Sequence, residues 1–379
     1  MSESTLQEGV RRVKVGCIGA GNISKQYLTA GAKFPVLDMV AVADLDLDRA
    51  KAAADEHGVP TACTVDELLA NDDIEIVLNL TIPAAHVEVA ERTLDAGKHA
   101  YMEKPLGIDR EDGRRLVERA KTSNLRVGCA PDTFLGAGHQ TARKLVDDGA
   151  LGTVTAVTAF MVSRGHEHWH PSPEFYYQPG GGPMFDMGPY YLTALLNLLG
   201  PASRIAGMAS TAIRDRTITS EPLNGRKIDV RTPDHYTGSI AFDSGVVGTI
   251  IQSFAMRNAP PMPQFVVYGT DATMLVPDPN NFDGKVKLKR EGSGDKAEFE
   301  EVPHQFVEGY GRSVGLADMA YAIQSGRPHR CSLEQGFTVL DLMQGFRDGL
   351  ETGTYHDVAR GYERPAPMPS DLPFGQLDL

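Results

Sequence analysis

The chain has 379 residues and a formal net charge of −13, with 41% hydrophobic and 23% charged residues. This length exceeds one ordinary domain and suits two, each with its own core. The acidic balance argues against nucleic acid or an anionic membrane as a partner, because both require concentrated basic residues. No apolar run is long enough for a membrane span, and four scattered cysteines indicate a reducing compartment. A cytoplasmic protein with a small-molecule substrate is therefore predicted.

Short apolar runs alternate with helical stretches over the first part of the chain. Strands are predicted at 13–18, 39–43, 74–80, 99–102 and 126–129, and helices at 25–32, 47–57, 84–96 and 110–123. Continuous apolar strands are typical of parallel strands that are buried on both faces. The alternation predicts an α/β fold that begins with a doubly wound parallel sheet, a Rossmann domain, over residues 1–130.

After residue 130 the pattern changes to strands that are joined by short turns. Strands are predicted at 153–162, 237–242, 246–254, 264–268, 274–276 and 285–289, and helices at 140–148, 187–199, 314–324 and 333–349. The polar segment 214–231 is predicted to be a long loop. We therefore expect residues 131–379 to form an α+β domain for substrate binding and oligomerisation, built on a large, mostly antiparallel open sheet.

A glycine-rich turn, Gly19-Ala20-Gly21-Asn22-Ile23-Ser24, follows the first predicted strand. In dinucleotide-binding domains, glycines here let the backbone approach the pyrophosphate, whose charge meets the N-terminal end of the next helix. Gly19 and Gly21 occupy the first two glycine positions of that motif, and Ser24 replaces the third. The predicted cofactor contacts of this turn are Gly19, Gly21, Asn22 and Ile23.

Asp44 ends the second predicted strand, about twenty residues beyond Ser24. A carboxylate at this place can accept both ribose hydroxyls of NAD and would repel the 2′-phosphate of NADP. No lysine or arginine follows in Leu45-Asp46-Leu47. NAD is therefore the predicted cofactor, and the alternative is that Asp44 is an ordinary strand-end or helix-capping carboxylate.

The tripeptide Glu103-Lys104-Pro105 follows the strand predicted at 99–102, roughly eighty residues after the glycine turn. In this order and at this separation, the two motifs resemble the Gfo/Idh/MocA family, named for glucose-fructose oxidoreductase, inositol dehydrogenase and a rhizopine-catabolism protein. The resemblance implies that Lys104 lies at the boundary between cofactor and substrate and contacts the substrate hydroxyl. It also implies that Glu103 and Lys104 border the cofactor.

The segment Thr81-Ile82-Pro83-Ala84-Ala85-His86 is similar to the T-x-P-x-x-H segment of the same family, which lies beside the nicotinamide. This resemblance adds Thr81, Pro83 and His86 to the expected cofactor contacts. Pro83 would also suit the first turn of the next helix because its φ is fixed. For His86, an alternative interpretation is a packed histidine without a direct role.

The segment 180–190 looks like the family's glycine-rich stretch leading into D-x-G-x-H, but Tyr190 stands where that histidine would be. The members that carry D-x-G-x-Y, glucose-fructose oxidoreductase and the dimeric dihydrodiol dehydrogenases, imply that Tyr190 is the proton carrier. Asp186 and Tyr190 are four residues apart at the start of a predicted helix, so both can face one ligand. Asp186 is expected to orient the substrate. The alternative is a packed aromatic pair, and we favour Tyr190 for chemistry and Tyr191 for packing.

Histidines alternate in Gly165-His166-Glu167-His168-Trp169-His170-Pro171, a spacing that also occurs in metal sites. Hydride transfer needs no metal, so we predict a substrate-binding loop and no metal site. Trp169 and His170, with His235 further along the chain, are the candidate substrate contacts. Core or capping roles remain alternatives for the two histidines, and the roles of His166 and His168 stay open.

These motifs predict an NAD-dependent oxidoreductase that transfers a hydride between a secondary hydroxyl of a sugar, cyclitol or glycoside and the nicotinamide. Two alternatives are an NAD-dependent glycosidase that uses transient oxidation and a non-catalytic NAD-binding regulator. The family resemblance further implies a homodimer or homotetramer that forms through the open sheet of the second domain.

Overall fold

The computed structural model describes residues 5–294 and 296–379, which form two compact units. Unit 1 contains the described residues up to Gln140 together with His304–Phe337 and Pro365–Leu379. Unit 2 contains the described residues of Thr141–Pro303 and Thr338–Arg364. The chain therefore crosses between the units more than once, so each unit is built from separate stretches. These two units do not test the predicted boundary between folding domains at residue 130, which stays a prediction.

Unit 1 is built around a parallel sheet of six strands in the order β3-β2-β1-β4-β5-β6. The strands are β1 (Val13–Ile18), β2 (Leu37–Ala43), β3 (Thr61–Cys63), β4 (Ile76–Asn79), β5 (His99–Met102) and β6 (Val127–Cys129). The helices between them are α1 (Ser24–Gly31), α2 (Leu47–His57), α3 (Val65–Ala70), α4 (His86–Asp95) and α5 (Arg110–Ser123). The predicted doubly wound Rossmann sheet is confirmed.

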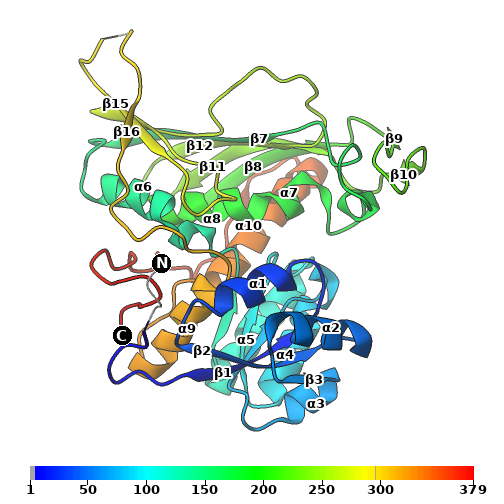
Figure 1. The fold of residues 1–379 in the computed structure, drawn as a ribbon. Coiled ribbons are helices and arrows are strands. Elements are labelled where there is room, and N and C mark those ends of the chain that lie inside the picture. Colours follow the sequence, from blue (N-terminus) through cyan, green and yellow to red (C-terminus); the bar gives the residue numbers. More distant parts are fainter. Residues whose placement is uncertain (1–4, 295) are drawn as a thin grey trace. The chain divides into compact units, whose positions relative to one another are not determined.

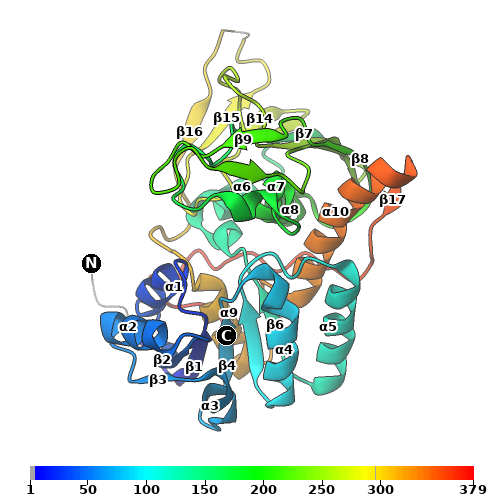
Figure 2. The ribbon, with the colours of Figure 1, turned by 90° about the vertical axis from the view of Figure 1, so that its right-hand side faces the viewer.

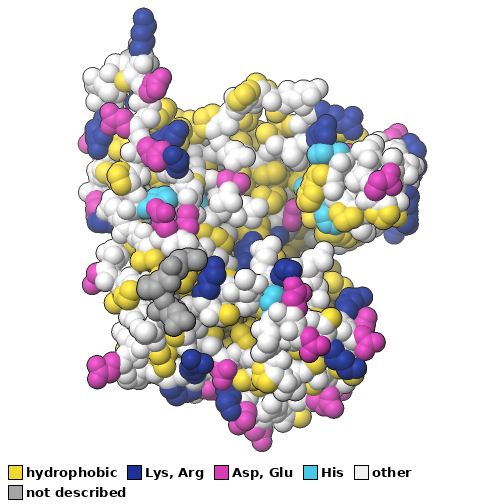
Figure 3. Space-filling view, in the orientation of Figure 1, with side chains coloured by type: hydrophobic (Ala, Val, Ile, Leu, Met, Phe, Trp, Pro, Cys, Tyr) yellow, Lys and Arg dark blue, Asp and Glu magenta, His cyan; other side chains and the backbone are white. Residues whose placement is uncertain are grey.

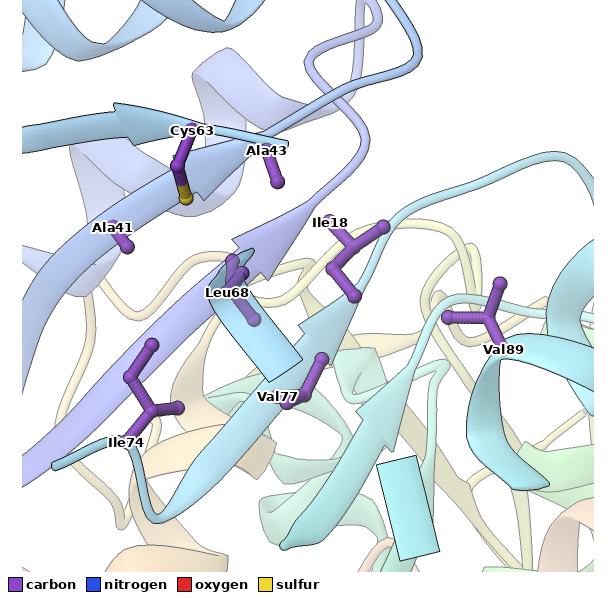
Figure 4. Close-up of a cluster of buried hydrophobic side chains, with 8 residues drawn as sticks. All are labelled: Ile18, Ala41, Ala43, Cys63, Leu68, Ile74, Val77 and Val89. Atoms are coloured by element: carbon purple, nitrogen blue, oxygen red, sulfur yellow. The ribbon is translucent and has the colours of Figure 1, made fainter. Parts of the chain in front are cut away.

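Helices cover both faces of this sheet (Figure 1), and buried apolar side chains of strands and helices pack together between the layers. Figure 4 shows one such cluster, in which Leu68 of α3 and Val89 of α4 lie with strand residues. The cluster consists of Ile18, Ala41, Ala43, Cys63, Leu68, Ile74, Val77 and Val89. Because β2 and β4 flank β1 on opposite sides, right-handed crossovers place α1 on the other face from α4. In Figure 2, α4 and α5 lie side by side.

Two short elements of unit 1, β3 and α3, were not predicted from the sequence. The strand has only three residues, and a helix of six residues gives little periodicity. A local signal for the helix exists: Thr64 and Glu67 form a capping box, in which each side chain binds the backbone N–H of the other residue. The chain later returns to unit 1 as α9 (Val314–Ser325), and Ser313 Oγ donates to the carbonyl of Tyr27 at 3.0 Å.

Unit 2 is built around a sheet of nine strands in the order β16-β15-β14-β13-β7-β12-β11-β8-β17. The strands are β7 (Val154–Val162), β8 (Ala202–Ser210), β11 (His235–Phe242), β12 (Val247–Ser253), β13 (Phe265–Gly269), β14 (Ala272–Leu275), β15 (Val286–Arg290), β16 (Glu300–Val302) and β17 (His356–Asp357). Its pairings are antiparallel except that of β7 with β12. The predicted large, mostly antiparallel sheet is confirmed.

Helices lie on one side of this sheet (Figure 1). They are α6 (Ala137–Asp147), α7 (Gly182–Asp186), α8 (Gly188–Leu199) and α10 (Leu333–Thr352), of which α6 and α10 begin in unit 1. On the helix-facing side of the sheet, Ile205, Tyr236 and Ile250 are buried. The opposite face exposes Met208, Val247 and Tyr268.

The structure corrects two expectations for unit 2 and adds strands, β8 among them, that were not predicted. The segment 214–231 is not a simple loop, because β9 (Asp215–Thr217) pairs with β10 (Lys227–Asp229). The helix expected at 187–199 begins at Gly188 and is preceded by the separate helix α7. Strand β8 was missed because it is rich in alanine, serine and glycine, and Gly207 lets the side chain of Phe346 pack directly on its backbone.

Candidate active site

The glycine turn lies where the carboxyl ends of β1 and β4 meet. Gly19 has φ +104°, and a Cβ there would lie 2.6 Å from the carbonyl oxygen of Leu80, so only glycine fits. At Gly21 a Cβ would meet nothing within 4 Å, so this backbone is open to a ligand. Ser24 Oγ donates to the carbonyl of Gly21 at 2.7 Å and fastens the turn to α1. Strand order reverses beside β1, which is where ligands bind in such sheets.

Asp44 is held against this turn by its own carboxylate. Its Oδ2 accepts the N–H of Ala20 at 2.8 Å, and its Oδ1 accepts the N–H of Asp46 at 2.9 Å. The cap of α2 is Asp46, whose side chain accepts the N–H of Asp48. Asp44 is therefore not the helix cap. Each of its oxygens keeps a further lone pair, so the carboxylate fits a pair of ribose hydroxyls beside the turn.

His86 joins the chain segments that leave β4 and β5. It is 1% exposed, with Nδ1 2.6 Å from the carbonyl oxygen of Pro105 and Nε2 3.0 Å from that of Thr81. Burial lowers the pKa of His86, whereas the two carbonyl oxygens act in the opposite direction, because each can accept only from a protonated ring nitrogen. Asn79 adds a second link, because its Oδ1 accepts from Thr81 Oγ1 at 2.7 Å and its Nδ2 donates to the carbonyl of His86 at 3.0 Å. His86 thus holds together the loops that carry Thr81 and Lys104. Pro83 begins a short 3₁₀ turn, Pro83–Ala85, that directly precedes His86.

Glu103 is a buried carboxylate that fixes the backbone of Lys104. Tyr27 of α1 donates its hydroxyl to Glu103 Oε1 at 2.8 Å, and the N–H of Lys104 donates to Oε2 at 2.8 Å. Tyr27 is 0% exposed and Glu103 6%, and burial raises the pKa of Tyr27, so the phenol stays a donor. This link between the glycine-turn helix and Lys104 was not anticipated from the sequence, because Tyr27 lies far from the tripeptide along the chain.

In unit 2, Asp186 and Tyr190 come from neighbouring helices. Asp186 is the last residue of α7, Met187 separates the helices, and Tyr190 lies in the first turn of α8. The Asp186 side chain is 20% exposed, whereas Tyr190 is 5% exposed. Tyr191 is fully buried, and this burial raises the pKa of its phenol, which agrees with a packing role for Tyr191.

The structure brings a sequence-distant histidine to Asp186. His166 Nε2 lies 3.3 Å from Asp186 Oδ2. The His166 ring packs against Tyr176, with centroids 4.0 Å apart, and against Phe254 at 4.5 Å. Sequence spacing alone could not choose His166 from the three alternating histidines, because the pairing depends on how the loop folds back.

Exposed aromatic side chains flank this pair. Trp169 and Phe175 are each 56% exposed, and the ring of His170 lies between them at centroid distances of 5.3 and 5.5 Å. We call Trp169, His170 and Phe175 the aromatic surface. In Figure 3, histidines (cyan) lie among hydrophobic side chains (yellow) on the part of unit 2 that carries β9 and β10. His168 is exposed in the same loop.

His235 is placed elsewhere in unit 2. It begins β11, where its Nδ1 lies 3.0 Å from Ser253 Oγ. Alternate strand residues point to opposite faces, so His235 shares a face with Thr237 and not with the buried Tyr236. Among the described residues, no group of three His, Cys, Asp or Glu side chains is arranged to hold a metal ion. Nor is any helix of the described chain long and apolar enough to cross a bilayer.

The structure thus groups the predicted residues into two sets. In unit 1, Gly19, Gly21 and Asp44 form one cluster, and Thr81, His86, Glu103 and Lys104 form another along the carboxyl ends of β4 and β5. In unit 2, Asp186 and Tyr190 lie on consecutive helices, and the ring of His166 contacts Asp186.

Comparison with known proteins gives matches over both units. Residues 13–130 match the oxidoreductase family with NAD-binding Rossmann fold, and residues 139–275 match the GFO/IDH/MocA C-terminal domain. The chain is 31% identical to a dTDP-3,4-didehydro-2,6-dideoxy-alpha-D-glucose 3-reductase of Streptomyces violaceoruber, over 58% of this chain and 63% of that protein. It is 30% identical to the enzyme of the same name from Streptomyces antibioticus, over 61% of this chain and 69% of that protein.

Among solved structures, levoglucosan dehydrogenase in complex with NADH and levoglucosan has the same fold, with a TM-score of 0.79 and 21% identity, over 92% of this chain and 100% of that one. The match with the Streptomyces violaceoruber reductase spans less than two thirds of that protein's length. With a Rossmann unit whose glycine turn holds Asp44 and a second unit that matches the family's C-terminal domain, the chain belongs to the Gfo/Idh/MocA family of oxidoreductases and carries an NAD-binding Rossmann domain.

Proposed function

We propose that this protein is an NAD-dependent oxidoreductase that transfers a hydride between a secondary hydroxyl of a sugar, cyclitol or glycoside and the nicotinamide. The observation that carries the proposal is the geometry of unit 1. Asp44 is fixed against an open glycine turn, and Lys104 is fixed by Glu103 at the carboxyl end of the same sheet. A glycine turn that is open to a ligand and the backbone of a lysine are thus held at the carboxyl end of one sheet.

The residues around the glycine turn fit NAD. The backbone of Gly19, Gly21, Asn22 and Ile23 would hold the pyrophosphate at the start of α1, whose first turn has no acidic residue to repel it. Asp44 would accept the ribose hydroxyls, and Thr81 and Pro83 would border the nicotinamide, with His86 and Glu103 bracing that edge. When bound, NAD accepts or returns the hydride at the nicotinamide ring.

The proposed chemistry of the chain itself is proton transfer and orientation. Tyr190 takes the proton of the reacting hydroxyl, and Asp186 orients the substrate through a hydrogen bond. The role that we propose for Lys104 is to contact a substrate hydroxyl and to stabilise negative charge on its oxygen. In the reverse direction, Tyr190 returns the proton to the carbonyl oxygen.

The aromatic surface supports a sugar ring as the substrate. Trp169 offers an exposed apolar face, and His170 offers a polar edge beside it. A sugar ring has one face of C–H groups and a rim of hydroxyls, which suits both. The names of the Streptomyces relatives, both reductases of a dideoxy-glucose derivative, also support a sugar. We retain Trp169 and His170 as proposed substrate contacts. We do not retain His235, because it lies on the face of the large sheet opposite the face that α7 and α8 cover.

Two further features belong to this proposal. The exposed apolar side chains Met208, Val247 and Tyr268 share one face of the large sheet and support a homodimer or homotetramer that buries it. The four cysteines are buried thiols without disulfides, which supports a cytoplasmic location.

The test is a panel of sugars, glycosides and cyclitols, with the purified protein and NAD, scored by the absorbance of NADH. We expect NADH with at least one compound and its loss in Lys104→Met. If the protein binds NAD but no compound yields NADH, the dehydrogenase proposal is wrong. In that case, release of free sugar from glycosides would identify a glycosidase, and its absence would favour a regulator.

A further inference from the structure

A buried ionic cluster lies under the histidine-rich loop of unit 2. At its centre is Arg216 of β9, whose side chain is 0% exposed. Its guanidinium donates to Glu167 Oε1, to Asp234 Oδ2 and to the carbonyl of Phe254, each at 2.8 Å. A buried guanidinium is tolerated only when it is paired and hydrogen-bonded, so these contacts fix Arg216 and its partners together.

This cluster fixes the backbone on which His166 is carried. Tyr177 donates its hydroxyl to Glu167 Oε2 at 2.5 Å, and the hydroxyl oxygen of Tyr177 accepts the backbone N–H of His166 at 3.1 Å. Gly165 has φ +99°, and a Cβ there would lie within 2.5 Å of atoms of Glu167, Arg216 and Tyr177. Only glycine fits at that position, so the cluster closes tightly around the start of the loop.

The ring of His166 is also fixed. Tyr176 meets it edge-on at an interplanar angle of 79°, and Phe254 packs on it at 4.5 Å. In this position Nε2 reaches Asp186 Oδ2 at 3.3 Å. Asp186 ends a helix of only five residues, which provides little intrinsic rigidity. An imidazole held on two sides is therefore a means of holding that carboxylate in one orientation.

We propose that His166 is a positioning residue that holds the Asp186 carboxylate in the orientation in which it meets the substrate, and that the Arg216 cluster holds His166 in turn. This inference rests on the proposed function, which gives Asp186 its role toward the substrate. It assigns a role to one histidine of the loop and explains why an arginine is buried in the mostly polar segment 214–231.

The test is a double-mutant cycle of His166→Phe and Asp186→Asn, with NAD and the best substrate of the panel. Phenylalanine keeps the packing against Tyr176 and Phe254 but removes the nitrogen. We expect His166→Phe alone to lower kcat/KM by about tenfold. Added to the Asp186→Asn variant, the same change should lower kcat/KM by less than about twofold, because the two residues act as a unit. His166→Gln, which keeps a donor, should restore most of the activity. The matched control is His168→Phe, in the exposed position two residues on, which should change kcat/KM by less than about twofold.

Other outcomes overturn the inference in distinguishable ways. If His166→Phe and Asp186→Asn reduce kcat/KM independently, their effects multiply, and His166 does not act through Asp186. If His166→Phe removes one limb of the pH–rate profile, His166 exchanges a proton itself and is not a positioning residue. If Asp186→Asn is fully active, the role of Asp186 in the proposed function is wrong, and the role of His166 falls with it.

A second readout needs no substrate. The urea-unfolding midpoints of the same four proteins should be non-additive, because the pair is in contact in the free protein. Additive midpoints would overturn the pairing even if the panel yields no substrate. Non-additive midpoints with a silent panel would keep the His166–Asp186 contact and reject only the proposed reaction.

Discussion

Replacing Asp44 by alanine removes the carboxylate that we propose binds the ribose of NAD. Its two oxygens are held by the N–H groups of Ala20 at 2.8 Å and Asp46 at 2.9 Å, which leaves lone pairs for two ribose hydroxyls. A hydrogen bond to a charged group contributes about 1.5–3 kcal/mol. Loss of both therefore corresponds to about 3 kcal/mol at the lower limit, or about a hundredfold weaker binding of NAD.

Binding of NADP should respond in the opposite sense. A carboxylate at this position repels the 2′-phosphate, so Asp44→Ala should leave the affinity for NADP unchanged or increase it. Calorimetric titration of both cofactors measures the two dissociation constants directly. In the unmutated protein, NAD should bind much more tightly than NADP.

The matched control is Asp46→Ala, two residues along the chain. Asp46 caps α2, so this change should lower stability by about 1 kcal/mol and leave NAD affinity nearly unchanged. Equal affinities for NAD and NADP in the unmutated protein would refute the role of Asp44. An equal loss of NAD affinity in both variants would show that the effect comes from loosening of the turn and not from a ribose contact.

Two further predictions concern the frame of unit 1. Tyr27→Phe removes the donor to the buried Glu103 and should lower the free energy of unfolding by about 2 kcal/mol. It should also reduce kcat/KM, because the same carboxylate accepts the backbone N–H of Lys104. An unchanged urea midpoint and unchanged kinetics would contradict this link. His329 precedes α10, and its Nε2 lies 3.1 Å from the carbonyl oxygen of Val127 in β6. Burial lowers the pKa of His329 from 6.5 to about 4, so the folded protein holds the ring neutral and loses stability, by up to about 3 kcal/mol, as the pH falls from 6.5 to about 4. His329→Gln should therefore flatten the fall of the urea midpoint between pH 7 and pH 5, and an equally steep fall in the variant would argue against His329 as its source.

Much of unit 1 could be predicted from the sequence because its signals are local. The glycine turn, the buried strand ending at Asp44 and the helix 47–57 are set by residues that are close in the chain, and the structure has β1, α2, β5 and α5 at the predicted bounds. Strand β3 was missed because three residues carry too little periodicity.

The features that the sequence did not reveal are long-range. Arg216 is buried because Glu167 and Asp234 meet it from two other segments, and no pattern around 214–231 specifies those partners. A local strand signal was available in the β-branched residues Thr217, with which β9 ends, and Ile218 and Thr219, which follow it, but the polar residues around them favoured a loop. The pairing of His166 with Asp186 depends on the same fold-back of the chain, so it could not be chosen from residue spacing.

The most direct test of the proposed reaction is the turnover of Tyr190→Phe beside that of Tyr191→Phe. Both changes remove one phenol hydroxyl and keep the ring, but Tyr190 lies in the first turn of α8, close in the chain to Asp186, and is 5% exposed, whereas Tyr191 is 0% exposed. With the substrate found in the panel, Tyr190→Phe should turn over about a hundredfold more slowly or worse, with NAD affinity nearly unchanged, while Tyr191→Phe keeps most of its turnover. Full turnover in Tyr190→Phe would contradict the account, because the proton of the hydroxyl would then leave by another group.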